Sequence, residues 1–309
     1  MPSGREERPR PSACLNCGST LVEAFCARCG QRNLDVRIPA RELALDAVED
    51  GLSLDSRVAR TVGPFLFQPG LLTVEWTSGR RARYSSPLRL YLLTSAIFFL
   101  AASLSDDAGP AIRFDTDEGK AVQAQVAGEL AAAGIDPATD PADVLRGTEA
   151  AHRKLRDAGW IGARIDDRWR SYGKLTLEQF AARVNASFRE WTPRVMFFLV
   201  PAAVLILALL WRRRWLSEHV VLALHLHAFA FAVFTAMLAF RLLPWSLPGQ
   251  VLRPALLLAL GAYFLLALRR VHGEPWGRTI AKGAVAGVLY GLALSVGLVG
   301  IALLALYFG

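Results

Sequence analysis

Five stretches of this chain are apolar for long enough to cross a lipid bilayer as helices. They lie at 87–104, 195–211, 219–243, 251–268 and 281–308. A helix needs about 20 apolar residues, with a range of about 17 to 25, to span a hydrocarbon core of about 30 Å. The pattern therefore predicts an all-α integral membrane protein built on a five-helix transmembrane bundle. The first two stretches are near the short limit and would cross with little tilt.

Basic residues cluster on one side of this predicted bundle. They stand before the first stretch, after the second and between the last two, at Arg80, Arg81, Arg83, Arg89, Arg212, Arg213, Arg214, Arg269, Arg270, Arg278 and Lys282. The loop at 244–250 carries no charge. Loops that face the cytoplasm are enriched in Lys and Arg. We therefore expect a cytoplasmic N-terminus, a periplasmic C-terminus and a place in the bacterial cytoplasmic (inner) membrane, since no secretory signal precedes residue 88.

The more polar segments predict smaller parts outside the membrane. Residues 1–13 are expected to be disordered, and 36–86 predicts cytoplasmic or interfacial helices. Six apolar residues of that segment are expected to pack either on lipid or beneath the bundle: Phe65, Leu66, Phe67, Leu71, Leu72 and Trp76. The insertion at 105–194 predicts an external helical domain. Apolar positions recur there at helical spacing in 121–133, 142–158 and 175–191.

All four cysteines of the chain lie close to its start, in two C-x-x-C-G motifs. They are Cys14, Cys17, Cys26 and Cys29. Four thiolates satisfy tetrahedral Zn²⁺ and leave no position for water, so the pattern predicts a structural zinc ribbon over 14–35, with one zinc per chain. Gly18 and Gly30 permit the tight turns, and Leu21, Val22 and Phe25 are expected to cover the metal. Iron in the same site and a pair of disulfides are the alternatives.

The third apolar stretch carries an unusual set of polar residues. Glu218, His219, His225 and His227 form a candidate intramembrane polar site. Glu218 and His225 are seven residues apart and share one helix face, His227 points roughly the opposite way, and His219 lies between. One reading is a metal or proton site completed by another span. The other is a set of histidines that are hydrogen-bonded within the bundle or that face lipid headgroups.

The fifth stretch carries glycines at a spacing of four. Gly283, Gly287 and Gly291 would open a groove on one side of a helix. Small residues at this spacing let membrane helices approach closely. The ladder predicts helix packing, either within the chain or in a homo-oligomer.

Composition argues against two broad classes of function. The net charge of +8 could suggest nucleic acid, but much of the basic excess stands beside apolar stretches, where it sets orientation. A nucleic acid partner is therefore not expected, and the lipid bilayer is. The sequence shows no G-x-S-x-G, H-E-x-x-H or phosphate-binding G-x-x-x-x-G-K motif. An enzyme is thus less expected than a non-enzymatic protein.

Three groups of motifs together resemble a bacterial membrane family, domain of unknown function 3667. The first group is C-x-x-C-G followed by C-x-x-C-G-Q, and the second is Q-P-G with the later G-R-R-A-R-Y-S-S-P-L-R-L-Y. The third is E-H-V-V-L-A-L-H-L-H-A-F. The resemblance runs from Cys14 to about Phe231. It implies zinc at the four cysteines and a role for the polar residues of the third stretch, but no established activity.

These observations favour one function and leave two others open. The leading hypothesis is a docking, scaffold or sensing component whose cytoplasmic zinc ribbon binds a protein partner. The alternative is a small transporter or channel subunit for protons, metal ions or anions that uses Glu218, His225 and His227. A membrane-embedded enzyme on a lipid substrate is the third, because histidines near the membrane surface can act as bases.

Overall fold

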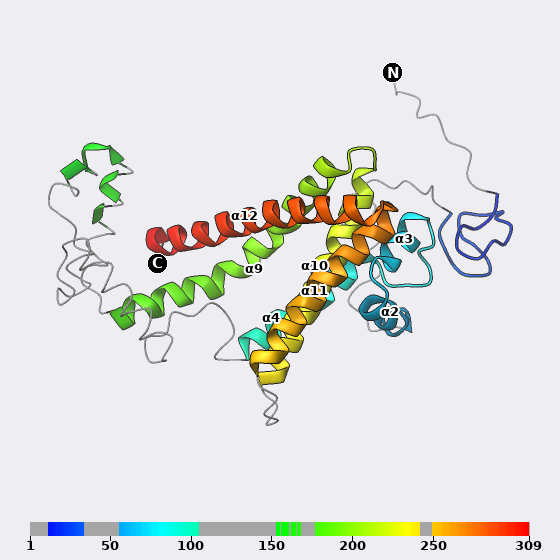
Figure 1. Ribbon diagram of the computed structural model, residues 1–309, viewed down its shortest axis with the longest axis horizontal. Coiled ribbons are helices and arrows are strands. Elements are labelled where there is room, and N and C mark those ends of the chain that lie inside the picture. The colour runs from blue at the N-terminus through cyan, green and yellow to red at the C-terminus, as the bar shows by residue number, and fades with distance from the viewer. Residues whose placement is uncertain are drawn as a thin grey trace, which may run out of the picture. The chain divides into compact units, whose positions relative to one another are not determined.

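The computed structural model describes residues 12–33, 56–104, 177–241 and 249–308 and, between 153 and 167, all but 155, 161 and 165. The helices are α2 (Ser56–Phe67), α3 (Leu71–Thr77), α4 (Pro87–Ser103), α9 (Leu177–Leu210), α10 (Leu216–Arg241), α11 (Gly249–His272) and α12 (Trp276–Phe308), as Figure 1 shows. Over these described residues there is no strand, only two isolated β-bridges. The predicted all-α class is therefore confirmed.

Four of the described helices are long and apolar enough to cross a membrane. Their apolar parts are Ala182–Leu210, Leu216–Phe240, Val251–His272 and Trp276–Ile301. They coincide with the last four predicted stretches, and they fit a membrane protein. Helix α4 is apolar too but has 17 residues, which at 1.5 Å per residue gives about 26 Å, just under the bilayer core of about 30 Å.

The chain divides into two compact units, and both α9 and α12 contribute to each. The first unit comprises Met1–Asp106 and Phe198–Leu292, and the second comprises Asp107–Phe197 and Ala293–Gly309. The residues of the candidate sites described below belong to the first unit. Residues 1–11 of the segment predicted to be disordered (1–13), the helix at 121–133 and most of the one at 142–158 lie outside the described residues.

The predicted external helix at 175–191 and the predicted span at 195–211 form one continuous helix. Helix α9 runs for 34 residues through Pro193 and Pro201, a length of about 51 Å. A proline costs a helix one hydrogen bond and a steric clash, and neighbouring groups in a membrane protein can absorb that cost. The predicted boundary between 194 and 195 is therefore not a break in the helix.

Helix α10 is the centre of the first unit. It is apolar on every side, with buried Val221, Leu222 and Phe231, as expected for a helix that other helices surround. Helix α4 packs along it through aromatic rings, with Tyr91 5.8 Å from Phe231 and Phe98 6.0 Å from Phe234 between ring centroids. Because later residues of α4 meet later residues of α10, the two helices run parallel.

The short helices α2 and α3 pack on α10 and α11. The Phe65 ring lies 5.9 Å from that of Phe229, and the Tyr263 hydroxyl donates to the Phe65 carbonyl over 2.8 Å. Gly70, with φ of +75°, lies so close to Ala267 that an added Cβ would be 3.0 Å from its Cα. Among the six apolar residues expected here, Phe65, Leu72 and Trp76 are buried, whereas Leu66 and Phe67 are exposed. Packing beneath the bundle is thus confirmed for Phe65, Leu72 and Trp76.

Candidate metal centre and polar positions of the bundle

The two cysteine motifs fold in the same way, at a spacing of 12 residues from Cys14 to Cys26. The Gly18 N–H donates to the Cys14 carbonyl and the Gly30 N–H to the Cys26 carbonyl, each over 2.8 Å. Both glycines have positive φ, 73° and 69°, a conformation that costs glycine little. Each motif is therefore a tight turn that aims two sulfurs to one side.

The four sulfurs converge on one point. All four Sγ atoms lie within 4.8 Å of one another. The closest pairs join the two motifs, with 3.5 Å between Cys14 and Cys29 and 3.5 Å between Cys17 and Cys26. A tetrahedral zinc with bonds of about 2.3 Å places its sulfurs about 3.8 Å apart. The cluster therefore fits a four-coordinate metal ion, with no ligand position left open.

The Ser19 hydroxyl stands between two of these sulfurs, 3.0 Å from Cys17 Sγ and 3.1 Å from Cys26 Sγ. Its hydrogen bonding lowers the pKa of the Cys17 thiol and lowers the pKa of Cys26 to about 6. Burial instead raises the pKa of Cys29 to about 11. Since thiolates are the ligand form, a bound cation would favour ionisation of Cys29.

Two of the three residues expected to cover the metal, Val22 and Phe25, are exposed instead. Val22 is 92% exposed and Phe25 58% exposed, while Leu21 is half-buried. That expectation was wrong because a ribbon of about twenty residues has too little chain to wrap a core around its own centre. The side chains of Arg28 and Arg32 are also exposed, and Arg32 pairs with Phe25 in an isolated β-bridge.

The ribbon is fastened to the connection between α3 and α4. The Gln31 side chain donates to the Gly79 carbonyl over 2.7 Å and accepts from the Arg81 and Ala82 N–H groups over 2.9 and 3.1 Å. Leu15 packs directly on Gly79, where φ is +81° and an added Cβ would lie 2.6 Å from Leu15 Cδ1. The two motifs C-G-Q and G-R-R-A-R thus meet in space.

The same connection contains a two-pronged ion pair. Arg80 reaches Glu75 through Nε to Oε2 at 2.8 Å and Nη2 to Oε1 at 2.6 Å. The Arg80 guanidinium holds the pKa of the Glu75 carboxyl below its usual range. This geometry fixes the chain where it turns from α3 towards α4.

The four candidate polar residues of α10 lie in separate surroundings. Glu218 pairs with Arg214 over 3.3 Å at the start of the helix. The His225 Nδ1 atom lies 2.9 Å from the Thr73 hydroxyl of α3, and both side chains are buried. His227 bonds to the Ala223 carbonyl and to the Tyr290 hydroxyl of α12. Glu218, His225 and His227 therefore do not converge on a single ligand.

His219, the fourth of these residues, faces a histidine that the sequence did not single out. Its ring centroid is 6.2 Å from that of His272 at the end of α11, and His272 stacks on Trp211 at 4.2 Å. Both histidines are buried, and none of their four ring nitrogens has a hydrogen-bond partner among the described residues. Lys282 lies over Trp211 and forms an ion pair with Glu274 over 2.6 Å. The sequence feature that could have drawn attention to His272 is its place just after Arg269 and Arg270, at the end of an apolar stretch.

The three glycines of α12 do not all lie at a close helix contact. A Cβ at Gly283 would lie 2.7 Å from Leu265 Cδ2, so this position packs on α11. A Cβ at Gly287 or at Gly291 would meet nothing within 4 Å. Within the described chain, only Gly283 of the three is thus a close-packing position.

A family described as Protein of unknown function (DUF3667) matches residues 55–99. The matched segment holds α2, α3, most of α4 and the connection that Gln31 contacts, and this match confirms the resemblance predicted from the motifs. No curated protein and no solved structure matches the chain. The chain is therefore similar to a family of unknown function over the segment that the ribbon contacts.

Proposed function

We propose that the protein crosses the bacterial cytoplasmic membrane five times, with α4 as the first crossing. The parallel packing of α4 on α10 supports this, because the first and third of five alternating spans must run in the same direction. The basic residues would then all face the cytoplasm together with the cysteines. The external domain at 105–194 and the C-terminus would face the periplasm.

The metal of the ribbon is proposed to be zinc. The convergence of four sulfurs without an open position supports a structural ion, and a reducing cytoplasm supports thiolates over disulfides. Elemental analysis of the purified full-length protein should find one zinc per chain, and Cys26→Ser should lose it. Iron at the same stoichiometry would overturn zinc.

The function proposed is that of a membrane scaffold that binds a cytoplasmic protein through the free side of its ribbon. One observation carries this proposal. The ribbon is held by Gln31 and Leu15, which contact the chain's own α3–α4 connection, while Val22 and Phe25 stay exposed. Two apolar side chains exposed three residues apart on so small a domain are available to a protein partner, and exposed apolar patches commonly mark protein-binding sites.

Site-specific photocrosslinking tests the scaffold. A photoreactive amino acid at Glu23, between the two apolar side chains, should give one discrete protein adduct in intact cells. The double substitution Val22→Ser with Phe25→Ser should abolish the adduct, because it removes the apolar contact and leaves all four metal ligands. The matched control, Val62→Ser, removes an exposed apolar residue of α2 instead. An adduct unchanged by the double substitution would exclude docking at this surface.

Transport is the second candidate, and the His219–His272 pair favours it. Buried ring nitrogens without partners are costly, and titratable groups within membrane spans often line ion or proton paths. Glu218, His225 and His227 would extend the path along α10. His272→Gln should lower proton or metal-ion flux into reconstituted vesicles at an equal amount of folded protein. Equal flux in the two proteins would remove this candidate.

A further inference from the structure

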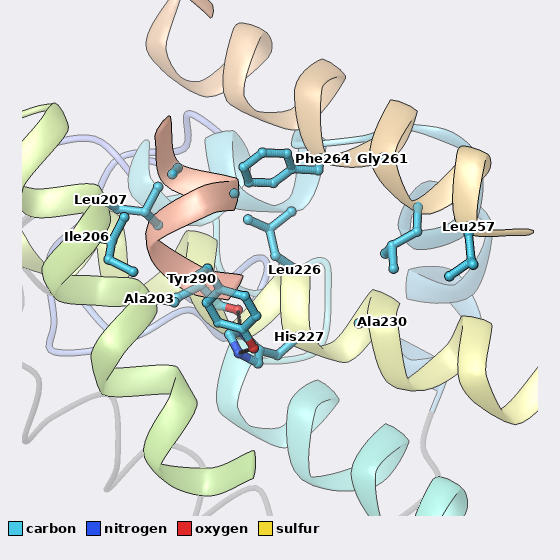
Figure 2. Close-up of a pocket in the computed structure, with 14 residues that line it drawn as sticks. Ala203, Ile206, Leu207, Leu226, His227, Ala230, Leu257, Gly261, Phe264 and Tyr290 are labelled. Atoms are coloured by element: carbon cyan, nitrogen blue, oxygen red, sulfur yellow. Dashed lines mark hydrogen bonds between the residues drawn. The ribbon is translucent and has the colours of Figure 1, made fainter. Parts of the chain in front are cut away.

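A cavity of about 370 Å³ lies among α9, α10, α11 and α12 (Figure 2). Leu207, Leu226 and Phe264 are among the side chains that line it. The lining holds no Asp, Glu, Lys or Arg, and its only titratable side chains are His227 and Tyr290. Its volume falls in the range of about 300 to 1,000 Å³ that is typical of small-molecule pockets.

Two glycines leave this space open. Gly261 of α11 and Gly287 of α12 both line the cavity, and an added Cβ at either would meet nothing within 4 Å. Both glycines are exposed, as is Leu257 of the lining. The cavity therefore reaches the outer surface of α11 and α12, which in a membrane faces lipid. Close-packed interiors do not keep voids of this size empty, so we expect an occupant. The opening between α11 and α12 would let a lipid-soluble molecule enter from the side.

The polar pair in the cavity has a defined direction of hydrogen bonding. His227 Nδ1 lies 2.8 Å from the Ala223 carbonyl, which can only accept, so Nδ1 carries the proton. In a neutral imidazole Nε2 is then an acceptor, and the Tyr290 hydroxyl, 2.9 Å away, donates to it. Figure 2 shows the two side chains joined in this way. What the pair still offers to a ligand is a lone pair on the Tyr290 oxygen.

We propose that this cavity binds an uncharged, lipid-soluble alcohol whose hydroxyl group donates to the Tyr290 oxygen. An ion is excluded because no side chain of the lining carries an opposite charge, and burial of an unpaired charge is very costly. A pure hydrocarbon would fill the space but leave the Tyr290 oxygen without a donor. The inference goes beyond the scaffold function, and its test does not involve the ribbon.

Photolabelling of the full-length protein in lipid vesicles tests this site. The probes are a long-chain alcohol with a photoreactive group in the chain and its methyl ether, which lacks the donor. The alcohol should label peptides of α10 to α12 in the wild-type protein more strongly than the ether, by roughly two- to tenfold, the worth of one hydrogen bond. Equal labelling by the two probes in the wild-type protein would overturn hydroxyl recognition.

Three variants locate the binding. Gly287→Leu should strongly reduce labelling by both probes, since its side chain projects into the cavity without a backbone clash. Gly291→Leu, the same change one turn along α12 and outside the lining, should leave both unchanged. Tyr290→Phe combined with His227→Leu removes both hydrogen-bond acceptors of the pair and should make the alcohol and the ether equal. If Gly287→Leu is monodisperse and still labels like the wild type, the probe binds elsewhere and the proposal is wrong.

Discussion

Gln31 has a chemistry that few other side chains could supply at its position. A primary amide both donates and accepts, so one residue can satisfy a carbonyl and two N–H groups of an irregular loop. A Glu side chain could only accept and a Lys side chain could only donate. The connection from Gly79 to Ala82 has no regular secondary structure, and its backbone groups need partners where they are shielded from water. The glutamine of C-G-Q therefore serves the membrane domain as well as the ribbon.

Gly79→Ala should weaken the attachment of the ribbon. Alanine at φ of +81° is strained, and its Cβ would lie 2.6 Å from Leu15 Cδ1. Together these effects should cost about 1–3 kcal/mol. The metal should consequently be lost to a competing chelator at least several-fold faster, which absorbance of a metal–dye complex would measure.

Two further variants make this result specific. Gly277→Ala places the same methyl group in open space at the start of α12 and should release metal at the wild-type rate. Leu15→Ala combined with Gly79→Ala removes the clash but not the backbone strain, so its rate should fall between those of Gly79→Ala and the wild type. Identical rates for Gly79→Ala and Gly277→Ala would mean that the Leu15 contact does not hold the folded ribbon.

The convergence of the four cysteines could be predicted from the sequence, but the attachment of the ribbon could not. Each C-x-x-C-G turn is local, so its spacing alone implies the geometry. Gln31 and Gly79 are 48 residues apart, and nothing in either motif indicates the other. The exposure of Val22 and Phe25 was missed for a related reason, since apolar character alone does not say whether a small domain can bury a residue.

Helix α10 combines an apolar surface with three histidines, and two of these bind partners on different helices. His225 bonds to α3 and His227 to α12. Between apolar surfaces in lipid, hydrogen bonds of this kind add direction to otherwise non-directional packing. His225 therefore fixes the position of α3 along α10, and His227 fixes that of α12.

Thr73→Val should destabilise the packing of α3 on α10. The substitution keeps the shape of the side chain but leaves the buried Nδ1 atom of His225 without a partner, at a cost of about 1–3 kcal/mol. The midpoint of thermal unfolding in detergent, followed by size-exclusion chromatography, should fall by several degrees.

The comparison for this prediction lies one turn further along α3. Thr77 bonds to the Thr73 carbonyl of its own helix, so Thr77→Val should have a smaller effect. Adding His225→Leu to Thr73→Val removes both polar partners and should recover part of the loss. A Thr73→Val protein as stable as Thr77→Val would show that the hydrogen bond to His225 contributes nothing to stability.

The long helices were predictable because each contains a continuous apolar run, and such a run alone indicates a membrane-spanning helix. Their partners were not, since membrane-spanning helices are equally apolar on faces that meet protein and faces that meet lipid. The helix ends were harder to predict, as the separate helix expected at 175–191 shows. Pro193 signals an end in a soluble helix, and α9 continues through it.

The direction of the whole chain through the membrane depends on α4. If this helix crosses, alkaline phosphatase fused after Leu104 should be active and a fluorescent protein there dark. Fusions after Trp211 should show the reverse, and fusions at Gly309 should again show phosphatase activity, as five crossings require. Fluorescence after Leu104 together with phosphatase activity after Trp211 would contradict the proposed orientation, because either α4 does not cross or the cysteines lie outside the cytoplasm.

The ribbon contacts the Gly79–Ala82 connection, which leads into α4. Loss of the metal should therefore change the hydrogen bonding of the backbone just before α4. Removing the metal with a chelator would unfold the ribbon, because it has little other core, and Gln31 would no longer hold the Arg81 and Ala82 N–H groups. Hydrogen exchange of these two amides should then accelerate strongly, and Gln31→Ala in the metal-bound protein should accelerate the same amides. Amides in the middle of α10 are the internal reference and should keep their protection in both cases. Protection at Arg81 and Ala82 that survives both treatments would mean that the metal centre and the membrane domain are independent of each other.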